Sequence, residues 1–295
     1  MSEIRIDALL PAEMATRAEY LGVRKAEMPA FTMFMLAILA GAFISLGAIF
    51  ATTVASGGMA VTAADGTVAY TSGLPYGVTR LLTGLVFCLG LILVVVGGAE
   101  LFTGNNLIVM AWASGKVTGR ALMRNWAIVY AGNFVASLAT AGLMFMSKQY
   151  TFGSDAVGIT ALKTAIAKCE LGFLQAVALG ILCNALVCLA VWMTYSARTT
   201  IDKILAIVFP ITAFVAAGFE HSIANMYFIP YALFIKGFDP EFVAKVGAKV
   251  PNIESLTWEA FFINNLIPVT IGNIIGGAVL VAAVYWVVFL RKKNV

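Results

Sequence analysis

The stretch Gly218-Phe-Glu-His-Ser-Ile-Ala-Asn225 places the only histidine of the chain, His221, inside an apolar segment that extends over Ile204–Ile235. A segment of this length and composition can cross a bilayer. Ionisable groups are costly at membrane depth, and where they occur they usually face a cavity or a substrate path. The alternative is a neutral histidine that only satisfies a backbone carbonyl. Because His221 lies at an interruption of the segment, the functional interpretation is favoured.

A second stretch, Gly98-Ala-Glu-Leu-Phe-Thr-Gly-Asn105, has the same frame. Both stretches follow the pattern Gly-x-Glu-x-x-x-x-Asn, and the matched residues are Gly98 with Gly218, Glu100 with Glu220 and Asn105 with Asn225. Another pair supports the match, since Asn125 and Gly132-Asn133 have the same spacing as Asn265 and Gly272-Asn273. Chance matches in an apolar chain are the alternative. Two matches in corresponding places favour an internal duplication.

Composition assigns the chain to the membrane proteins. Of 295 residues, 61% are hydrophobic and 12% are charged, whereas soluble domains are about half apolar and a quarter charged. About 20 apolar residues suffice for one crossing. We therefore expect an all-α membrane protein with transmembrane helices over Phe31–Val54, Leu81–Ala113, Trp126–Met146, Leu171–Tyr195, Ile204–Ile235 and Phe261–Leu290.

The second and fifth of these six spans are longer than one crossing needs, so we expect both to be broken at their Gly-containing polar segments. A duplicated unit of three spans enters the membrane from opposite faces, which gives two inverted repeats. Half-helices that begin near Asn105 and Asn225 then have their N-termini at mid-membrane. Two positive dipole ends at the centre suit an anion.

The expected organisation has three parts. Residues 1–30 form a cytoplasmic amphipathic segment, at the membrane surface or under the bundle. Residues 31–290 form the channel domain, with repeats at about 31–150 and 165–290, and residues 291–295 form a cytoplasmic tail. Twelve of the nineteen Lys and Arg residues fall on the side of the termini. By the positive-inside rule, both termini are expected in the cytoplasm.

Several function classes lack support in this sequence. No basic run is interleaved with aromatic residues, so nucleic-acid binding is not expected. The single histidine and the four scattered cysteines do not provide a usual metal-ligand set, and no cofactor fingerprint is present. An intramembrane enzyme that uses Glu100, Glu220 and His221 as acids and bases is an alternative. It is disfavoured because no nucleophile motif is present.

The polar and apolar residues near the breaks have two interpretations each. Glu100 and Glu220 are expected to stabilise the breaks through hydrogen bonds, with proton transfer as the alternative. The hydroxyl of Thr103 can donate to an oxyanion or cap a half-helix. The remaining candidates are either packing residues or lining of a path: Phe87, Leu91, Leu101, Phe214, Asn184 and Asn273.

The two breaks, together with Asn265-Leu-Ile-Pro-Val-Thr-Ile-Gly-Asn-Ile-Ile-Gly-Gly277, resemble the formate/nitrite transporter family, with the closest match to its formate channels. The resemblance covers nearly the whole chain. It implies an aquaporin-like protomer that assembles as a homopentamer in the bacterial inner membrane, surrounded by lipid. It also implies a channel for formate and similar small anions, without a cofactor.

The resemblance further implies roles for individual residues. Leu91 and Phe214 would form the cytoplasmic-side constriction, and Phe87 part of the opposite one. His221 and Thr103 would form the central anion site, with Asn184 and Asn273 as polar lining and Lys168 as an outer attractor. Leu101 is the counterpart of His221 in the other break.

The expected function is a passive or proton-linked channel for formate and related monovalent anions. A nitrite or hydrosulfide channel of the same fold is one alternative, because the electrostatic argument fits all these anions. A proton-coupled secondary anion transporter is another, because inverted repeats are also typical of transporters.

Overall fold

Six long apolar helices form the body of the molecule, which a computed structural model describes over residues 7–62 and 68–291. Helices long and apolar enough to cross a membrane within this described part are α2 (Ala30–Ala55), α3 (Tyr76–Gly97), α5 (Gly119–Met146), α7 (Phe173–Ser196), α8 (Thr200–Ala217) and the last span Trp258–Leu290. The expected six-span fold is confirmed. The last span combines α11 (Trp258–Ala260) and α12 (Ile267–Ile274) with π-helical stretches over Phe261–Leu266, Ile275–Ala283 and Trp286–Leu290.

The expected breaks are also present. The second span consists of α3, an irregular segment, the 3₁₀-helix Gly104–Ile108 and α4 (Val109–Ala113). The fifth consists of α8 and α9 (Ser222–Phe238), separated by a short irregular segment. Both α3 and α8 end at a glycine in the left-handed conformation, with φ of 76° at Gly98 and 78° at Gly218. This is a common way to end a helix, because glycine has no Cβ to strain that conformation.

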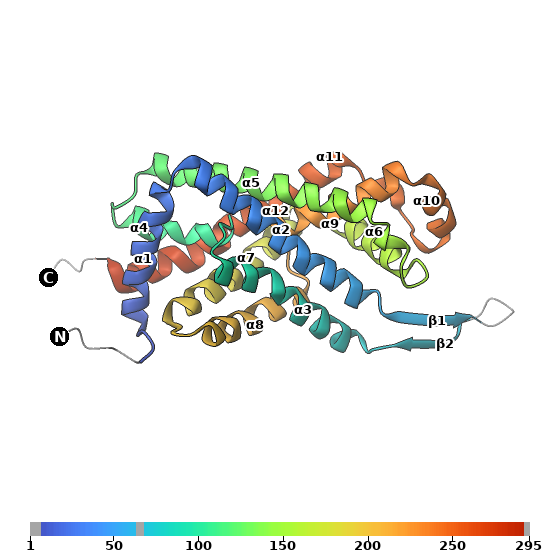
Figure 1. Ribbon diagram of the computed structural model, residues 1–295, viewed down its shortest axis with the longest axis horizontal. Coiled ribbons are helices and arrows are strands. Elements are labelled where there is room, and N and C mark those ends of the chain that lie inside the picture. Colours follow the sequence, from blue (N-terminus) through green and yellow to red (C-terminus); the bar gives the residue numbers. More distant parts are fainter. Residues whose placement is uncertain (1–6, 63–67, 292–295) are drawn as a thin grey trace.

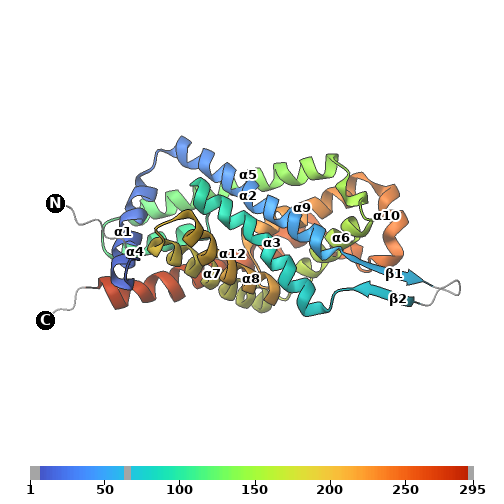
Figure 2. The same ribbon diagram turned by 60° about the horizontal axis from the view of Figure 1, so that its bottom comes forward.

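The two ends of the molecule carry different elements (Figure 1). Helix α1 (Pro11–Glu27) lies across one end beside α4 and the last span. Helices α6 (Ala156–Cys169) and α10 (Pro240–Val246) and the strands β1 (Gly58–Thr62) and β2 (Val68–Gly73) lie at the opposite end (Figures 1 and 2). The described part of the N-terminal segment packs against this end of the helix bundle. The antiparallel β-hairpin was not expected from the sequence.

Helix crossings in the two halves are close and alike. Helix α2 packs against α5 in the first half, and α7 packs against α12 in the second. A Cβ atom added at Gly132 of α5 would collide with Ala37, and one added at Gly272 of α12 would collide with the Val177 carbonyl. Small residues at such positions let membrane helices approach closely.

Side chains cap the helix starts at the α1 end. The Oγ1 of Thr118 accepts a hydrogen bond from the N–H of Ala121 at 3.1 Å, where α5 begins. At the start of α8, Thr199 Oγ1 accepts from the N–H of Asp202 at 3.2 Å, and Asp202 Oδ2 accepts from the N–H of Thr199 at 2.9 Å. This reciprocal capping box satisfies two N–H groups that a helix start leaves free.

Candidate ion pathway between two broken helices

Each break is held by an ion pair between a lysine and a buried glutamate. Glu100 Oε1 lies 2.6 Å from Lys25 Nζ, and Glu220 Oε1 lies 2.7 Å from Lys168 Nζ. The second carboxylate oxygen accepts from the amide of Asn105 in one break and of Asn225 in the other, at 2.7 Å in both. Charges this deep are tolerated when they are paired and hydrogen-bonded. The geometry agrees with a hydrogen-bonded structural role for both glutamates.

Asparagines of the third and sixth spans complete the two networks. The amide of Asn105 donates to Asn125 Oδ1 at 2.9 Å, and that of Asn225 donates to Asn265 Oδ1 at 2.7 Å. Asn125 and Asn265 in turn donate to the backbone carbonyls of the two lysines, both at 3.0 Å. The two copies therefore repeat the same hydrogen bonds.

Asn133 and Asn273 hold the interrupted backbone itself. Each donates to the carbonyl of its glutamate at 3.0 Å. Asn133 Oδ1 accepts from the N–H of Phe102 at 3.0 Å, and Asn273 Oδ1 accepts from that of Ser222 at 2.9 Å. Of the two interpretations of Asn273, packing residue or path lining, its hydrogen bonds agree with the first, because its amide holds the backbone. The amide of Asn184 donates to the Asn273 carbonyl at 2.6 Å and to that of Thr103 at 3.3 Å, so it also braces the breaks.

The expectation of two free helix N-termini at the centre needs correction. In the first break the helical segments after Thr103 are only five residues each, a 3₁₀-helix followed by α4. In the second break, α9 is 17 residues long, but its N–H groups at Ser222 and Ala224 donate to Asn273 and His221. At α9, two of the N-terminal N–H groups are thus satisfied by the protein's own side chains.

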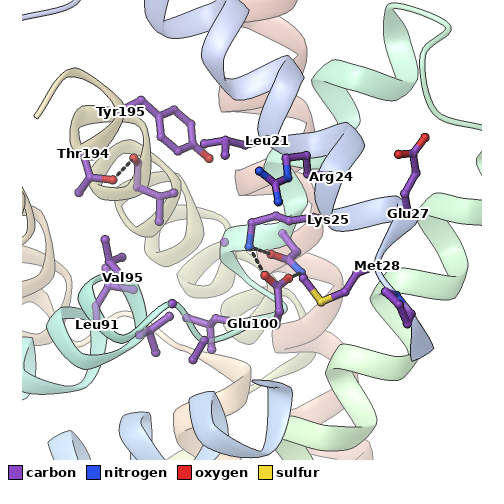
Figure 3. A pocket seen from close by; sticks show the side chains of 18 residues that line it. Leu21, Arg24, Lys25, Glu27, Met28, Leu91, Val95, Glu100, Thr194 and Tyr195 are labelled. Atoms are coloured by element: carbon purple, nitrogen blue, oxygen red, sulfur yellow. Dashed lines mark hydrogen bonds and ion pairs between the residues drawn. The ribbon is translucent and has the colours of Figure 1, made fainter. Parts of the chain in front are cut away.

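Two vestibules approach the breaks from opposite ends. The first, which we name the α1 vestibule, has a volume of about 580 Å³. Figure 3 shows Lys25 reaching to Glu100, and Leu91 of α3 also lines this vestibule. Its charged lining consists of Arg24, Lys25, Glu27 and Glu100.

The second, which we name the α6 vestibule, has a volume of about 620 Å³. Its lining includes Phe87, Phe214 and His221. Its charged lining consists of Arg80, Lys163, Lys168 and Glu220.

A cavity of about 10 Å³ lies between the vestibules, just large enough for one water molecule. It shares Leu91 and Leu101 with the α1 vestibule, and Phe87, Phe214 and His221 with the α6 vestibule. The remaining lining residues are Ile44, Val187 and Ile211. His221 is thus the one polar side chain among residues that line this cavity. Passage of any ion requires these apolar side chains to move.

The position of Phe214 differs from the expectation. Its ring centroid lies 5.7 Å from that of Phe87 in an edge-on contact, and both rings line the α6 vestibule. Leu91 instead lines the α1 vestibule together with Leu101. Phe214 comes from the last turn of α8, and Phe87 comes from the middle of α3. The two phenyl rings therefore form one closure and the two leucines the other.

His221 and Thr103 lie in contact, one from each break. His221 Nε2 lies 3.0 Å from Thr103 Oγ1. His221 Nδ1 accepts a hydrogen bond from the N–H of Ala224 at 3.1 Å and so caps α9. Because Nδ1 is an acceptor, the hydrogen of the neutral ring is on Nε2 and points to Thr103. The hydroxyl hydrogen of Thr103 is then available to another acceptor.

Two features of the site were not expected from the sequence. Lys25, the partner of Glu100, belongs to α1, which was assigned to a separate N-terminal segment. Its counterpart Lys168 belongs to α6, so α1 and α6 are equivalent elements and the first repeat begins at α1. Arg80 was also missed. Its guanidinium donates to the carbonyls of Val215 and Ala216 at the end of α8.

Comparisons with known proteins agree with this geometry. The family model described as formate/nitrite transporter matches residues 12–287. The chain belongs to the formate/nitrite transporter family. A relative from Escherichia coli (strain K12), the formate channel FocA, is 47% identical over 289 residues, which cover 98% of this chain and 97% of the relative.

Two solved structures of this family have the same fold. One, described as a pentameric formate channel with formate bound, is 46% identical with a TM-score of 0.78, and the match covers 89% of this chain and 98% of that one. The other, an FNT family ion channel, is 26% identical with a TM-score of 0.77 and coverage of 94% and 98%. The family resemblance noted in the sequence is confirmed, and its members named here are channels rather than enzymes.

Proposed function

We propose that this protein conducts formate and related small monovalent anions across the bacterial inner membrane. The observation that carries the proposal is the cavity between the two breaks, where His221 is the single polar lining residue and lies between two charged vestibules. Formate is the ion named for the E. coli relative and for the solved structure with formate bound.

The mechanism starts from the cost of moving a charge through an apolar constriction. An ion that enters past Phe87 and Phe214, or past Leu91 and Leu101, loses its water and needs replacement donors. His221 supplies Nε2–H, and Thr103 supplies its hydroxyl hydrogen. A carboxylate first accepts the hydroxyl hydrogen of Thr103, and it accepts the Nε2–H of His221 once the contact between these two side chains opens. The ion then leaves through the other constriction.

Proton linkage through His221 has a structural cost. With hydrogen on Nε2, the ring can accept a proton only at Nδ1, which caps α9 through Ala224. A proton at Nδ1 removes that hydrogen bond, and loss of an N-cap costs about 0.5–2 kcal/mol. Conduction of the anion with a neutral His221 is therefore our first mechanism, and transfer of a proton through the ring is the second.

We further propose a homopentamer in a lipid bilayer, with the α1 end in the cytoplasm. The solved relative described as pentameric supports the assembly. Large apolar side chains are exposed on the single chain, including Phe31 at 77% and Phe209 at 78%, and lipid or neighbouring subunits would cover them. The excess of Lys and Arg on the side of the termini supports the orientation.

The proposal is tested by flux into proteoliposomes with formate, acetate, nitrite, chloride and hydrosulfide at two pH values. We expect formate to be among the fastest and its flux to persist without a proton gradient. Faster flux of nitrite or hydrosulfide than of formate would identify that ion as the preferred substrate instead. Uptake that stops when the proton gradient is removed would indicate a proton-coupled transporter.

A further inference from the structure

The two vestibules differ in charge. The four charged side chains that line the α1 vestibule, Arg24, Lys25, Glu27 and Glu100, sum to zero. The α6 vestibule is lined by three cations, Arg80, Lys163 and Lys168, and by one anion, Glu220, which leaves a net charge of +2 with His221 neutral. The two symmetry-related breaks therefore lie between vestibules of different net charge.

The excess charge does not come from Lys168. Its ammonium is 2.7 Å from Glu220 Oε1, and the side chain of Lys168 is only 15% exposed, so this pair contributes no net charge. Lys163 lies five residues earlier on α6, is exposed, and forms no ion pair within residues 7–62 and 68–291. Its charge is free to act on ions in the vestibule.

Arg80 provides the other uncompensated charge. Its guanidinium donates to two backbone carbonyls, Val215 and Ala216, rather than to a carboxylate. Backbone carbonyls at the C-terminus of α8 have only a partial negative charge. They orient the guanidinium without neutralising it, and Arg80 has no ion pair within the described residues.

We propose that Arg80 and Lys163 make the α6 vestibule an anion-concentrating entrance, so that the channel passes more current when voltage drives anions inward from that side. This inference rests on the proposed anion conduction. Positive charge on a concave, low-dielectric wall raises the local concentration of anions. A passive channel produces no net flux without a driving force, and the asymmetry therefore appears only as rectification under voltage.

The field of these side chains is sensitive to salt. The Debye length is about 30 Å at 0.01 M and about 3 Å at 1 M. We expect currents at opposite voltages to differ by about twofold or more in symmetric 0.01 M formate, since surface potentials reach several kT. The ratio should approach one at about 1 M, where the charges are screened.

The test uses current–voltage curves of the full-length channel in planar bilayers. Lys163→Glu reduces the lining charge of the α6 vestibule to zero, equal to that of the other vestibule, and should abolish rectification at low salt. Lys249→Glu is the matched control, because Lys249 is exposed and does not line the vestibule. It follows α10, which lies at the same end of the molecule as α6 (Figure 1). The control should rectify like the wild type.

A second variant tests the same charge within a single open channel. In Lys163→Cys, a cationic thiol reagent added to one chamber should restore rectification, and an anionic reagent should remove it. The four native cysteines are buried, so the engineered thiol is the exposed one. Wild-type currents without rectification at low salt, or a Lys163→Glu channel that still rectifies like the wild type, would overturn the inference. Absence of any anion current would instead overturn the proposed function.

Discussion

The break at Gly98–Asn105 and the break at Gly218–Asn225 have nearly the same hydrogen bonds but different contents. Each has a glycine with positive φ, a lysine–glutamate pair and two asparagines that hold the carboxylate and the backbone. The first break places the hydrocarbon of Leu101 at the central cavity, and the second places the imidazole of His221 there. The shared hydrogen bonds fix the backbone of both breaks, and the side chain of His221 alone provides a polar, titratable group at the cavity.

A smaller difference concerns the lysines. Lys25 also donates to Asn105 Oδ1 at 3.1 Å. The matching oxygen of Asn225 has no hydrogen-bond partner within the described residues. The lysine side chain is also more exposed in the first break, at 28% against 15% for Lys168. The first break is thus closer to solvent, and the Oδ1 of its Asn105 is hydrogen-bonded. The second break is less exposed, and the Oδ1 of its Asn225 accepts no hydrogen bond from the described residues.

The largest effect is expected when a lysine is removed. Lys168→Met leaves the carboxylate of Glu220 buried without a counter-ion, which costs about 3–5 kcal/mol. Lys25→Met should cost less because its site is more exposed. The free energy of unfolding in mixed detergent micelles measures both. The double variant Lys168→Met/Glu220→Gln should recover most of the loss, and equal losses at the two breaks would contradict the difference in burial.

The next effect concerns transport. His221→Leu gives both breaks the same side chain at the cavity and removes a donor to the anion. A hydrogen bond to a charged group contributes about 1.5–3 kcal/mol, so formate flux should fall by about ten- to a hundredfold. His221→Asn keeps an acceptor for the Ala224 N–H and an amide donor near the cavity, although the shorter side chain does not reach as far as Nε2, and it should retain more flux than His221→Leu. If the pH profile of His221→Asn matches that of the wild type, His221 takes no part in a proton step.

Loss of the backbone clamps should weaken both breaks to a similar extent. Asn133→Ala orphans the buried N–H of Phe102, and Asn273→Ala orphans that of Ser222. Each unsatisfied group costs about 1–3 kcal/mol. The thermal unfolding temperatures of the two variants in detergent measure and compare these losses. Asn264→Ala is the control, since Asn264 has one part-buried hydrogen bond at 3.3 Å, and an equal loss there would argue against the clamp.

The smallest effect concerns the far ends of the two half-helices. Ser114 after α4 accepts from Trp286 Nε1 at 3.0 Å, while Asp239 after α9 accepts from the hydroxyl of Tyr150 at 2.6 Å. The hydrogen bond from Tyr150 has the larger effect and that from the Phe242 N–H the smaller, and both hold the pKa of Asp239 below its usual value. A depressed pKa contributes stability above the unfolded value of about 3.9 that is lost as pH falls through the folded value.

Tyr150→Phe should therefore move the onset of acid unfolding to higher pH, and at neutral pH it should cost about 0.5–1.5 kcal/mol. Acid titration of the tertiary fold between about pH 5 and pH 2 checks this shift, across the unfolded Asp value. Trp286→Phe removes the corresponding hydrogen bond to Ser114, which has no ionisable side chain. An acid shift of the same size in Trp286→Phe would contradict the role of Asp239.

Much of the fold followed from residue types along the chain. The apolar lengths gave six spans, and the Gly-x-Glu-x-x-x-x-Asn frame located both breaks and the duplication. The six spans could be predicted because membrane crossing depends on local composition, and the breaks could be predicted because their pattern occurs twice within short stretches of sequence. The β-hairpin could not, because strands β1 and β2 contain Gly, Ser and Thr typical of a loop and gain their bonds from each other.

The site was less predictable because its contacts join distant segments. Glu100 and Lys25 are 75 residues apart, and no local pattern pairs them. The contact of Phe214 with Phe87 could not be predicted, since the position of Phe214 depends on where α8 ends relative to α3. Asn184 and Asn273 could be either packing residues or path lining from the sequence, and the structure is needed to see that their amides bond to backbone carbonyls.

The central cavity of about 10 Å³ has a consequence for energy conservation. Protons cross membranes readily along an unbroken file of hydrogen-bonded water molecules. The cavity has room for one water, and its walls are apolar side chains apart from the single imidazole of His221. Such walls interrupt the file whenever the constrictions are closed. A cell can therefore keep this pore in an energised membrane without short-circuiting its proton gradient between passages of the ion.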